Sequence, residues 1–506
     1  MSVARFRGPA TGNLGDLIRP DVAPGRVGLI DLSESGREWT YGALDAAAEA
    51  FAAALVHQDL QSGDRVAILA DNCAEHVIAY LGTMRAGGVA VPVNHRLPLE
   101  TVHYILRDSE ARLCVADSAR VQQVPDGLPR ILIRDNGTSG FGAFIDPFRG
   151  RAAERRSSRE TAEILYTSGS TGRPKGVVLS HAGQLWALGV HVTALPGVGE
   201  STVIVAPLYH MNALFALSVS LLNGVTVVLL PRFEVSSYLR AVAQYRCTTL
   251  SGIPTMFALM VRQTELTDTL DLTSVEHISI GSAPLTESLI ERVRNLFPRA
   301  QVSNGYGTTE AGPSIFGEHP RGLPRPALSL GYPIPEVNVR LAGGSGDEGT
   351  LQVQSPAMFS EYLHLPEITA QKLRDAWYDT GDVMRRDEQG FYFFTGRADD
   401  MFVCGGENVF PGEIEKMLEQ HPGVLQAAVV PVPDEIKGEI PIAFVVLKDP
   451  DLSAQDLKRF SLANGPAFSH PRAFVVVSEL PVATTHKLDK RPLRPKALEV
   501  AAALRR

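Results

Sequence analysis

The chain has 506 residues, too many for one hydrophobic core, and at roughly 100 to 200 residues per domain this length indicates several modules. Hydrophobic residues make up 44% and charged residues 21% of it, which excludes disordered, collagenous and coiled-coil classes. Lysine and arginine number 48 against 56 acidic residues, so the formal charge of −8 provides no basic field for a nucleic-acid backbone. A nucleic-acid partner is therefore not expected.

The first 300 residues alternate short β-branched runs with helical patterns, which is typical of parallel sheets covered by helices. One unit shows this pattern with a strand at 65–69, a helix at 74–86 that Gly87 ends, and the next strand at 89–93. Further strands are expected at 113–116, 202–205, 225–230, 248–250 and 277–280. The predicted fold class is α/β, with doubly wound parallel sheets in a large N-terminal domain.

After Pro320 the pattern changes. Glycine and proline punctuate short strands such as 351–354, which predicts a small antiparallel β-rich subdomain over about 320–397. Beyond it, helical and strand-like segments indicate a separate α+β domain, with a helix at 413–419 and strands at 425–430, 442–447 and 473–477. We place the boundary at 398–400, which gives an N-terminal domain at 1–398 and a mobile C-terminal domain at 399–506.

The four cysteines are scattered with no CxxC spacing, so neither a zinc site nor a disulfide framework is indicated. A reducing cytoplasm fits this pattern, and the N-terminus lacks the apolar segment of a secretory signal. The most apolar stretch, 211–231, contains the turn dipeptide Asn223-Gly224. It is therefore expected to form a buried helix and a buried strand rather than a membrane span.

A glycine-rich loop that follows the strand-like run 163–166 gives a strong local signal. Its glycines let backbone N–H groups approach a polyphosphate closely, its hydroxyls are donors, and Lys175 adds positive charge. A P-loop kinase would need G-x-x-x-x-G-K-[ST] at the start of a helix, whereas here Pro174 precedes the lysine and removes a donor. The predicted phosphate-binding residues are Thr167, Ser168, Gly169, Ser170, Thr171, Gly172 and Lys175.

This loop resembles the phosphate loop of the adenylate-forming superfamily, in its acyl-CoA synthetase and aryl-CoA ligase branch, and other motifs of that family follow in order. The segment 207–210 resembles the motif whose histidine, here His210, borders the acyl carboxylate. The segment 281–285 resembles the loop that packs against adenine, and 304–310 resembles the motif that contributes a stacking tyrosine, a phosphate-binding threonine and a Mg²⁺-binding glutamate. The resemblance implies nucleotide contacts by Gly281, Ser282, Ala283, Pro284, Asn304, Gly305, Tyr306, Gly307 and Thr309, and a catalytic and metal-binding role for Glu310.

Two more motifs of the family lie nearer the C-terminus. The segment 378–382 resembles the motif whose aspartate, here Asp382, binds the ribose hydroxyls. Arg397, in Gly-Arg-Ala-Asp-Asp, is expected to be a second ribose or phosphate contact. The segment that contains Gly405 and Gly406 resembles the tunnel for the pantetheine arm of CoA.

The segment 480–487 resembles the catalytic-lysine motif and assigns Lys487 to catalysis. His486 replaces the usual glycine there, and Lys490 is the competing candidate. Arg96 resembles an arginine that aryl-CoA ligases place on the phosphates of CoA, with a helix-flanking surface arginine as the equal alternative. His470 stands where related ligases carry another basic residue.

The resemblance implies an AMP-forming acyl-CoA synthetase that uses ATP, Mg²⁺ and coenzyme A. A carboxylate attacks the α-phosphorus of ATP to give an acyl-adenylate and pyrophosphate, and the thiol of CoA then displaces AMP to give a thioester. Because Lys487 and the Gly405-Gly406 segment serve different steps, the C-terminal domain is expected to rotate about Asp399 between them.

The pocket for the acid is expected to be lined by the segments 184–192, 208–217, 252–260, 281–285 and 305–317. These pocket segments contain no lysine or arginine to pair with a second carboxylate, so the acid is expected to be apolar and aliphatic or aromatic. Trp186, Met211, Phe215 and Met256 are expected to give that pocket apolar surface. The alternatives are a stand-alone amino-acid or carrier-protein-directed adenylating enzyme, a luciferase-like oxygenase, and a non-catalytic nucleotide-binding regulator. The expected partners are a small-molecule carboxylic acid, ATP and CoA, with no membrane span, a cytoplasmic location and a homodimer as the candidate assembly.

Overall fold

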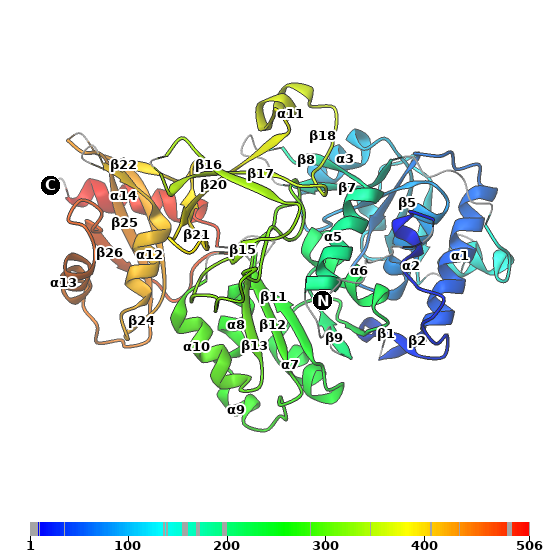
Figure 1. Cartoon of the computed structure of the whole chain (residues 1–506), viewed down its shortest axis with the longest axis horizontal. Coiled ribbons are helices and arrows are strands. Elements are labelled where there is room, and N and C mark those ends of the chain that lie inside the picture. The colour runs from blue at the N-terminus through cyan, green and yellow to red at the C-terminus, as the bar shows by residue number, and fades with distance from the viewer. Residues whose placement is uncertain are drawn as a thin grey trace.

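The structure is a computed structural model. It describes residues 9, 11–34, 36–134, 137, 140–153, 160–167, 173–194, 200–283, 285–344, 346–404, 407–434, 436–482 and 488–504. Figure 1 shows the N-terminal helices and strands at one end, the green sheet in the middle, and the C-terminal helices and strands at the other end. Within these residues no helix combines the length and the apolar character needed to cross a membrane. The apolar stretch at 211–231 forms helix α6 (Met211–Leu222) and strand β10 (Thr226–Leu229), as predicted.

The first sheet contains seven strands of the described chain, in the order β13-β12-β11-β9-β10-β1-β2. The strands from β13 to β1 are parallel to their neighbours, and β2 is antiparallel at the edge. One face buries Leu250 and Ile278 against a cluster that includes residues of the helices α7, α8 and α10. The bounds are β1 (Val27–Asp31), β2 (Arg37–Thr40), β9 (Ser201–Ile204), β11 (Thr249–Gly252), β12 (His277–Gly281), β13 (Gln301–Gly305), α7 (Val235–Gln244), α8 (Pro254–Met260), α9 (Thr264–Thr267) and α10 (Glu287–Leu296).

The second sheet has the order β18-β8-β7-β4-β3-β5-β6 among the described strands. Its strands β4, β3, β5 and β6 are parallel to their neighbours, and β4 is parallel to β7, whereas β7 and β8 pair antiparallel with Thr167 opposite Lys175. A connection as short as the phosphate loop cannot make the crossover that a parallel pair requires. The bounds are β3 (Arg65–Leu69), β4 (Val89–Pro92), β5 (Ala111–Asp117), β6 (Arg130–Ile133), β7 (Thr161–Thr167), β8 (Lys175–Ser180), β18 (Glu361–Tyr362), α1 (Tyr41–His57), α2 (Ala74–Arg85), α3 (Leu99–Asp108), α4 (Phe141–Ile145) and α5 (His181–Ala194).

An antiparallel sheet follows, as the glycine and proline pattern predicts. Its order is β16-β17-β20-β19, and β21 pairs with β20 so that Asp382 lies opposite Arg397. The bounds are β14 (Phe316–Gly317), β15 (Tyr332–Pro333), β16 (Asn338–Ala342), β17 (Glu348–Gln354), β19 (Leu373–Arg374), β20 (Trp377–Arg386), β21 (Tyr392–Arg397) and α11 (Pro366–Lys372).

The C-terminal part has its own sheet, in which β23, β22, β25 and β24 are neighbours and β26 pairs with β25. A separate hydrophobic cluster around Phe444 and Leu418 forms its core. Lys416 Nζ donates to the carbonyl of Phe394 at 2.9 Å and thus connects this part to β21. The bounds are β22 (Phe402–Cys404), β23 (Glu407–Val409), β24 (Val424–Asp434), β25 (Gly438–Leu447), β26 (Ala473–Val476), α12 (Pro411–Glu419), α13 (Ala454–Asn464) and α14 (Arg494–Leu504), with short 3-10 helices at Leu14–Asp16, Leu32–Glu34, Val121–Gln123, Asp146–Phe148 and Arg491–Leu493.

Candidate active site

A cavity of about 1750 Å³ lies where both large sheets, the antiparallel sheet and the C-terminal part meet. It brings together every predicted site residue that the structure describes. These are Arg96, Thr167, Lys175, His210, Gly281, Ser282, Ala283, Asn304, Gly305, Tyr306, Gly307, Thr309, Glu310, Asp382 and Arg397. The predicted residues Ser168, Gly169, Ser170, Thr171, Gly172, Pro284, Gly405, Gly406 and Lys487 lie outside the described residues.

Two glycines bring the ends of neighbouring strands close together at this cavity. Gly281 ends β12 and Gly305 ends β13, and the two residues are partners across the parallel pair. A Cβ atom on Gly281 would lie 2.7 Å from the carbonyl oxygen of Gly305, which is closer than side chains tolerate. The carboxyl ends of parallel strands are where open α/β sheets bind ligands. The absence of a side chain at Gly281 therefore allows the start of the predicted adenine loop to pack directly against the backbone of Gly305.

Asp382 is the centre of a hydrogen-bonded group. It is 6% exposed, and its carboxylate accepts hydrogen bonds from Tyr306 Oη at 2.5 Å and from Arg397 Nη1 at 2.9 Å. Arg397 also donates to Asp399 from Nε at 3.0 Å. Burial raises the pKa of Asp382, and the positive charge of Arg397 opposes that rise. A carboxylate fixed by two donors faces the cavity at the place predicted for the ribose.

Glu310 is held by a residue that the sequence motifs did not identify. Tyr362 Oη donates to Glu310 Oε1 at 2.8 Å, and the tyrosine side chain is buried. Lys175 Nζ lies 4.7 Å from the centre of the same ring, a cation–π distance. Burial lowers the pKa of Lys175, and the carboxylate of Glu310 partly offsets this effect. One tyrosine therefore positions the predicted metal ligand and supports the predicted phosphate-binding lysine.

His210 precedes helix α6 as its N-cap residue, and its ring lies 4.7 Å from the ring of Tyr209. Arg96 lines the same cavity, and its charge opposes the burial that raises the pKa of Tyr209 to about 12. Both residues lie in connections rather than in strands. His210 lies after β9 of the first sheet, and Arg96 lies after β4 of the second sheet. The histidine expected at the acyl carboxylate thus reaches the cavity from the start of α6.

The residues that flank Lys487 face the cavity from the C-terminal part. Leu488, Lys490 and Arg491 are among its lining residues. The competing candidate, Lys490, pairs with Glu415 of α12 at 2.6 Å. His470 lies beside Arg472, and Arg472 Nη1 is 2.7 Å from His470 Nδ1. The positive charge in this part of the chain therefore comes from the arginine.

The cavity also contains a cation that the pocket segments did not include. Arg325 lines the wall, and its donors bond the carbonyls of Ser329, Asn304 and Leu330, the first of them at 3.1 Å. Met211, Phe215 and Met256 line the cavity as expected. Trp186 was expected there as well, but its indole N–H instead donates to Glu336 at 3.2 Å.

A cavity on this fold that brings carboxylates and hydrogen-bond donors together with apolar side chains is typical of an enzyme that activates a carboxylate. Family models agree. The model for "AMP-binding enzyme" matches residues 19–363, and the model for "AMP-binding enzyme C-terminal domain" matches residues 413–487. The chain therefore belongs to the AMP-binding enzyme family.

Similar proteins place the chain within this family. It is 29% identical to the long-chain-fatty-acid–CoA ligase FadD13 of Mycobacterium tuberculosis, covering 95% of this chain and 98% of the relative. It is 31% identical to a 4-chlorobenzoate–CoA ligase of an Arthrobacter species, covering 93% and 92%. Among solved structures, the anthranilate CoA ligase AuaEII in complex with anthranoyl-AMP has a TM-score of 0.88 at 26% identity, covering 99% of this chain and 100% of that one. The chain is an AMP-forming acyl-CoA synthetase that uses ATP and CoA.

Proposed function

We propose that the enzyme activates an apolar aliphatic or aromatic carboxylic acid, and that the residues around the 1750 Å³ cavity carry out formation of the acyl-adenylate. The observation that carries this proposal is the meeting, in one cavity, of the residues expected at adenine, ribose, phosphate and acyl carboxylate. If the glycine-rich loop were only a polar surface loop, Thr167 and Lys175 at its ends would not be expected to line this cavity with the other predicted site residues.

Each part of the nucleotide has a matching residue type. The diol of the ribose donates two hydrogen bonds, and Asp382 is the acceptor that we assign to it. Arg397 supplies a second contact and holds Asp382 in place. Lys175 supplies charge for the terminal phosphates, and His210 borders the acyl carboxylate. Lys487 then stabilises the charge that develops on the α-phosphate.

We assign a Mg²⁺ site to Glu310. Among the described residues no group of three or more histidine, cysteine, aspartate or glutamate side chains could hold a metal ion. A single carboxylate suits Mg²⁺, because this ion takes one or two protein carboxylates and completes its shell with waters and phosphate oxygens. When bound, it would neutralise phosphate charge. Tyr362 orients the carboxylate toward that task.

The proposed reaction has two steps, formation of the acyl-adenylate and formation of the thioester. In the first, a carboxylate oxygen forms a bond to the α-phosphorus, and the bond from this phosphorus to pyrophosphate breaks. In the second, the thiol sulfur of CoA forms a bond to the acyl carbon, AMP leaves with the electron pair, and the thiol proton is released. We propose that residues 399–506 move as one domain between these steps, with the turn at Asp399 as the hinge.

The acid is proposed to lack a second carboxylate. Met211, Phe215 and Met256 give the cavity apolar surface, and each CH₂ that they bury contributes about 0.8 kcal/mol. Arg325 lines the cavity and could in principle pair with a second carboxylate, but its Nε and Nη2 already donate to backbone carbonyls. A buried second carboxylate without a dedicated partner would carry a desolvation penalty of several kcal/mol.

The test is an exchange assay between pyrophosphate and ATP, run over aliphatic, aromatic and dicarboxylic acids and followed by detection of the thioester with CoA. Exchange with benzoate-type or medium-chain acids is expected, with lower kcat/KM for malonate and succinate. Preference for a dicarboxylate would reject the apolar acid and indicate that a cation of the cavity lining pairs with the second carboxylate. Absence of exchange with every acid, in folded protein that binds ATP, would favour the regulator. Thioester formation on a carrier protein but not on CoA would favour the carrier-directed alternative. The cytoplasmic location and the homodimer stay predictions.

A further inference from the structure

The wall that the first sheet contributes to the cavity is polar where a parallel sheet is normally apolar. Ser251 on β11 lies opposite Ser279 on β12, and Ser279 lies opposite Ser303 on β13. All three line the cavity. Parallel strands are usually buried on both faces and are rich in valine, isoleucine and leucine. A row of three serines across neighbouring strands therefore needs an explanation.

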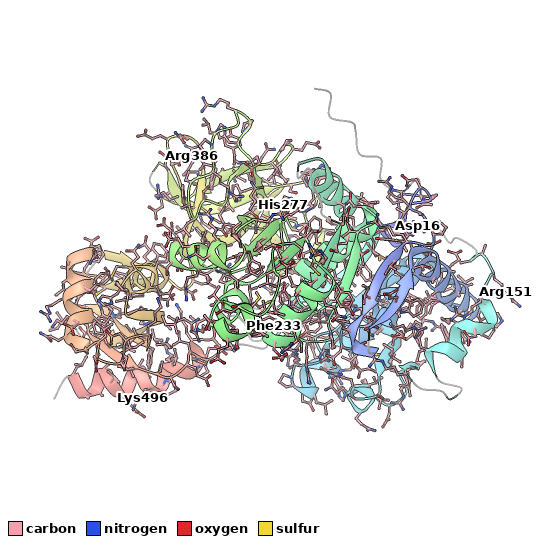
Figure 2. All side chains as sticks on the ribbon, turned by 90° about the horizontal axis from the view of Figure 1, so that it is seen from below. Asp16, Arg151, Phe233, His277, Arg386 and Lys496 are labelled. Carbon is pink, nitrogen blue, oxygen red and sulfur yellow. The ribbon has the colours of Figure 1, made fainter. Side chains whose placement is uncertain are left out.

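A second polar row lies two residues earlier on the same strands. Thr249 is opposite His277, and His277 is opposite Gln301. These residues also line the cavity, and Figure 2 labels His277 in the middle of the molecule, on the green part of the chain. The residues between the rows, such as Leu250 and Ile278, also border the cavity, but they are at most 1% exposed and belong to the hydrophobic cluster on the other face. The polarity thus belongs only to the cavity face.

Several of these polar groups have no hydrogen-bond partner within the described part of the protein. Thr249 Oγ1 is buried and unpaired. The side chains of Ser251, Ser279 and His277 form no hydrogen bond with any other described residue, whereas Ser303 Oγ donates to the carbonyl of Ile278 at 3.3 Å. Ser279 is exposed in the middle of its strand, because it faces the cavity. An alkyl tail on this wall would displace water from these groups and offer no hydrogen bond in return.

The lining that α6 contributes to the cavity has a different character. Helix α6 contributes mainly apolar residues, among them Met211, Phe215, Ala216 and Val219. Its two polar lining residues are Asn212 and Ser220, and the Ser220 hydroxyl already donates to the carbonyl of Ala216. The cavity therefore has both an apolar and a polar wall. Positions two residues apart on a strand are separated by about 7 Å. The serine row thus lies about 7 Å, and the Thr249 row about 13 Å, from the row of Gly281 and Gly305 at the nucleotide end.

We propose that the acid is amphipathic along its length. Its carbon skeleton is extended or polycyclic, one edge is apolar and packs on α6, and the other edge carries hydroxyl or carbonyl groups that bond the two polar rows. The first of these groups lies about 7 Å beyond the row of Gly281, or about six bonds of an extended chain. This inference rests on the proposed function and specifies its substrate class. The wall calls for neutral groups, because its two rows contain hydroxyls, an amide and an imidazole but no lysine or arginine.

The experiment compares dodecanoic acid with its monohydroxy derivatives, hydroxylated at successive carbons, in the exchange of pyrophosphate into ATP. A hydroxyl near the middle of the chain is expected to raise kcat/KM about tenfold, as one or two neutral hydrogen bonds would. In the double variant Ser251→Ala with Ser279→Ala this preference is expected to fall to about onefold, because the hydroxyls that bond the substituent are gone.

Ser288→Ala on α10 is the matched control, because that helix packs on the apolar face of the same sheet. It should retain the preference. Melting temperatures verify that each variant is folded, and Ser279→Ala alone, at an exposed position, keeps the test open if the double variant is unstable.

Two results would overturn the proposal, namely preference for the unsubstituted acid at every hydroxyl position, or a preference that survives in the double variant. Calorimetric binding of the same acids in the presence of AMP separates this inference from the proposed function. Tighter binding of the hydroxylated acids without any exchange would support the polar wall and reject the activation chemistry. Exchange of pyrophosphate without any preference for hydroxylated acids would support the activation chemistry and reject the polar wall as a binding surface.

Discussion

The substitution Tyr362→Phe tests the role of one hydroxyl at the Mg²⁺ site that we propose at Glu310. Tyr362 Oη donates to Glu310 Oε1 at 2.8 Å, and the tyrosine is only 1% exposed, so its ring is held in place by packing. A hydrogen bond to a charged group is worth about 1.5–3 kcal/mol, which corresponds to about a ten- to hundredfold change in an equilibrium constant. Loss of a group that orients a metal ligand typically has the same effect on metal affinity. Phenylalanine keeps the ring that lies 4.7 Å from Lys175, so that contact is retained.

The assay is exchange of pyrophosphate into ATP at fixed ATP and increasing Mg²⁺. In the variant, the Mg²⁺ concentration at half-maximal rate is expected to rise about ten- to hundredfold, with the rate largely restored at saturating Mg²⁺. Tyr332→Phe is the control, because the Tyr332 hydroxyl makes no hydrogen bond with another described residue. An unchanged Mg²⁺ dependence, or a loss of rate that Mg²⁺ does not restore, would refute the assignment of Glu310 and Tyr362.

Three further predictions follow from the site and the core. Lys487→Ala should slow adenylation by orders of magnitude and spare thioester formation from a supplied acyl-adenylate, and the opposite ranking of Lys487→Ala and Lys490→Ala would show that the lysine is misassigned. Asp382→Asn should raise KM for ATP about ten- to hundredfold, because a neutral acceptor replaces a carboxylate, and an unchanged KM would exclude the ribose contact. Burial raises the pKa of Glu163 to about 7 despite the hydrogen bond that Tyr80 donates, so folding binds a proton at this carboxyl, and its contribution to stability should fall by about 3 kcal/mol as pH rises from about 4.5 past 7. In urea unfolding, the stability of the wild type relative to Glu163→Gln should therefore be lower at pH 8 than at pH 5, and a difference that does not change with pH would show that Glu163 is not the titrating group.

The positions of two of the predicted nucleotide loops, at 281–285 and 304–310, could be inferred from the sequence because each lies where a strand ends in glycine. Gly281 and Gly305 end neighbouring parallel strands, and that arrangement alone brings two separate motifs to one edge. The alternation of helices and strands was equally visible, as in the unit that β3, α2 and β4 form.

Tyr362 could not be predicted in the same way. It reaches Glu310 because β18 pairs antiparallel with β8, which places Tyr362 opposite Val177. This is a pairing between short segments far apart in the chain, and a two-residue strand has no periodicity to detect.

The polar cavity wall also could not be recognised from the sequence. The alternation of serine with isoleucine in β12 predicts a strand with one polar face, but the sequence does not distinguish a face toward water from a face toward a ligand cavity.

Arg397 explains how the nucleotide site and the proposed hinge influence each other. It lies directly opposite Asp382 in the pairing of β20 with β21, at the last residue of β21. Its Nη1 bonds Asp382 at 2.9 Å, and its Nε bonds Asp399 at 3.0 Å. Burial by itself would lower the pKa of this guanidinium, and the two carboxylates together raise it. Because one cation serves both carboxylates, a rotation about Asp399 changes the charge that balances Asp382. The proposed rotation of the C-terminal domain would therefore also change the charge beside Asp382, the residue that we assign to the ribose.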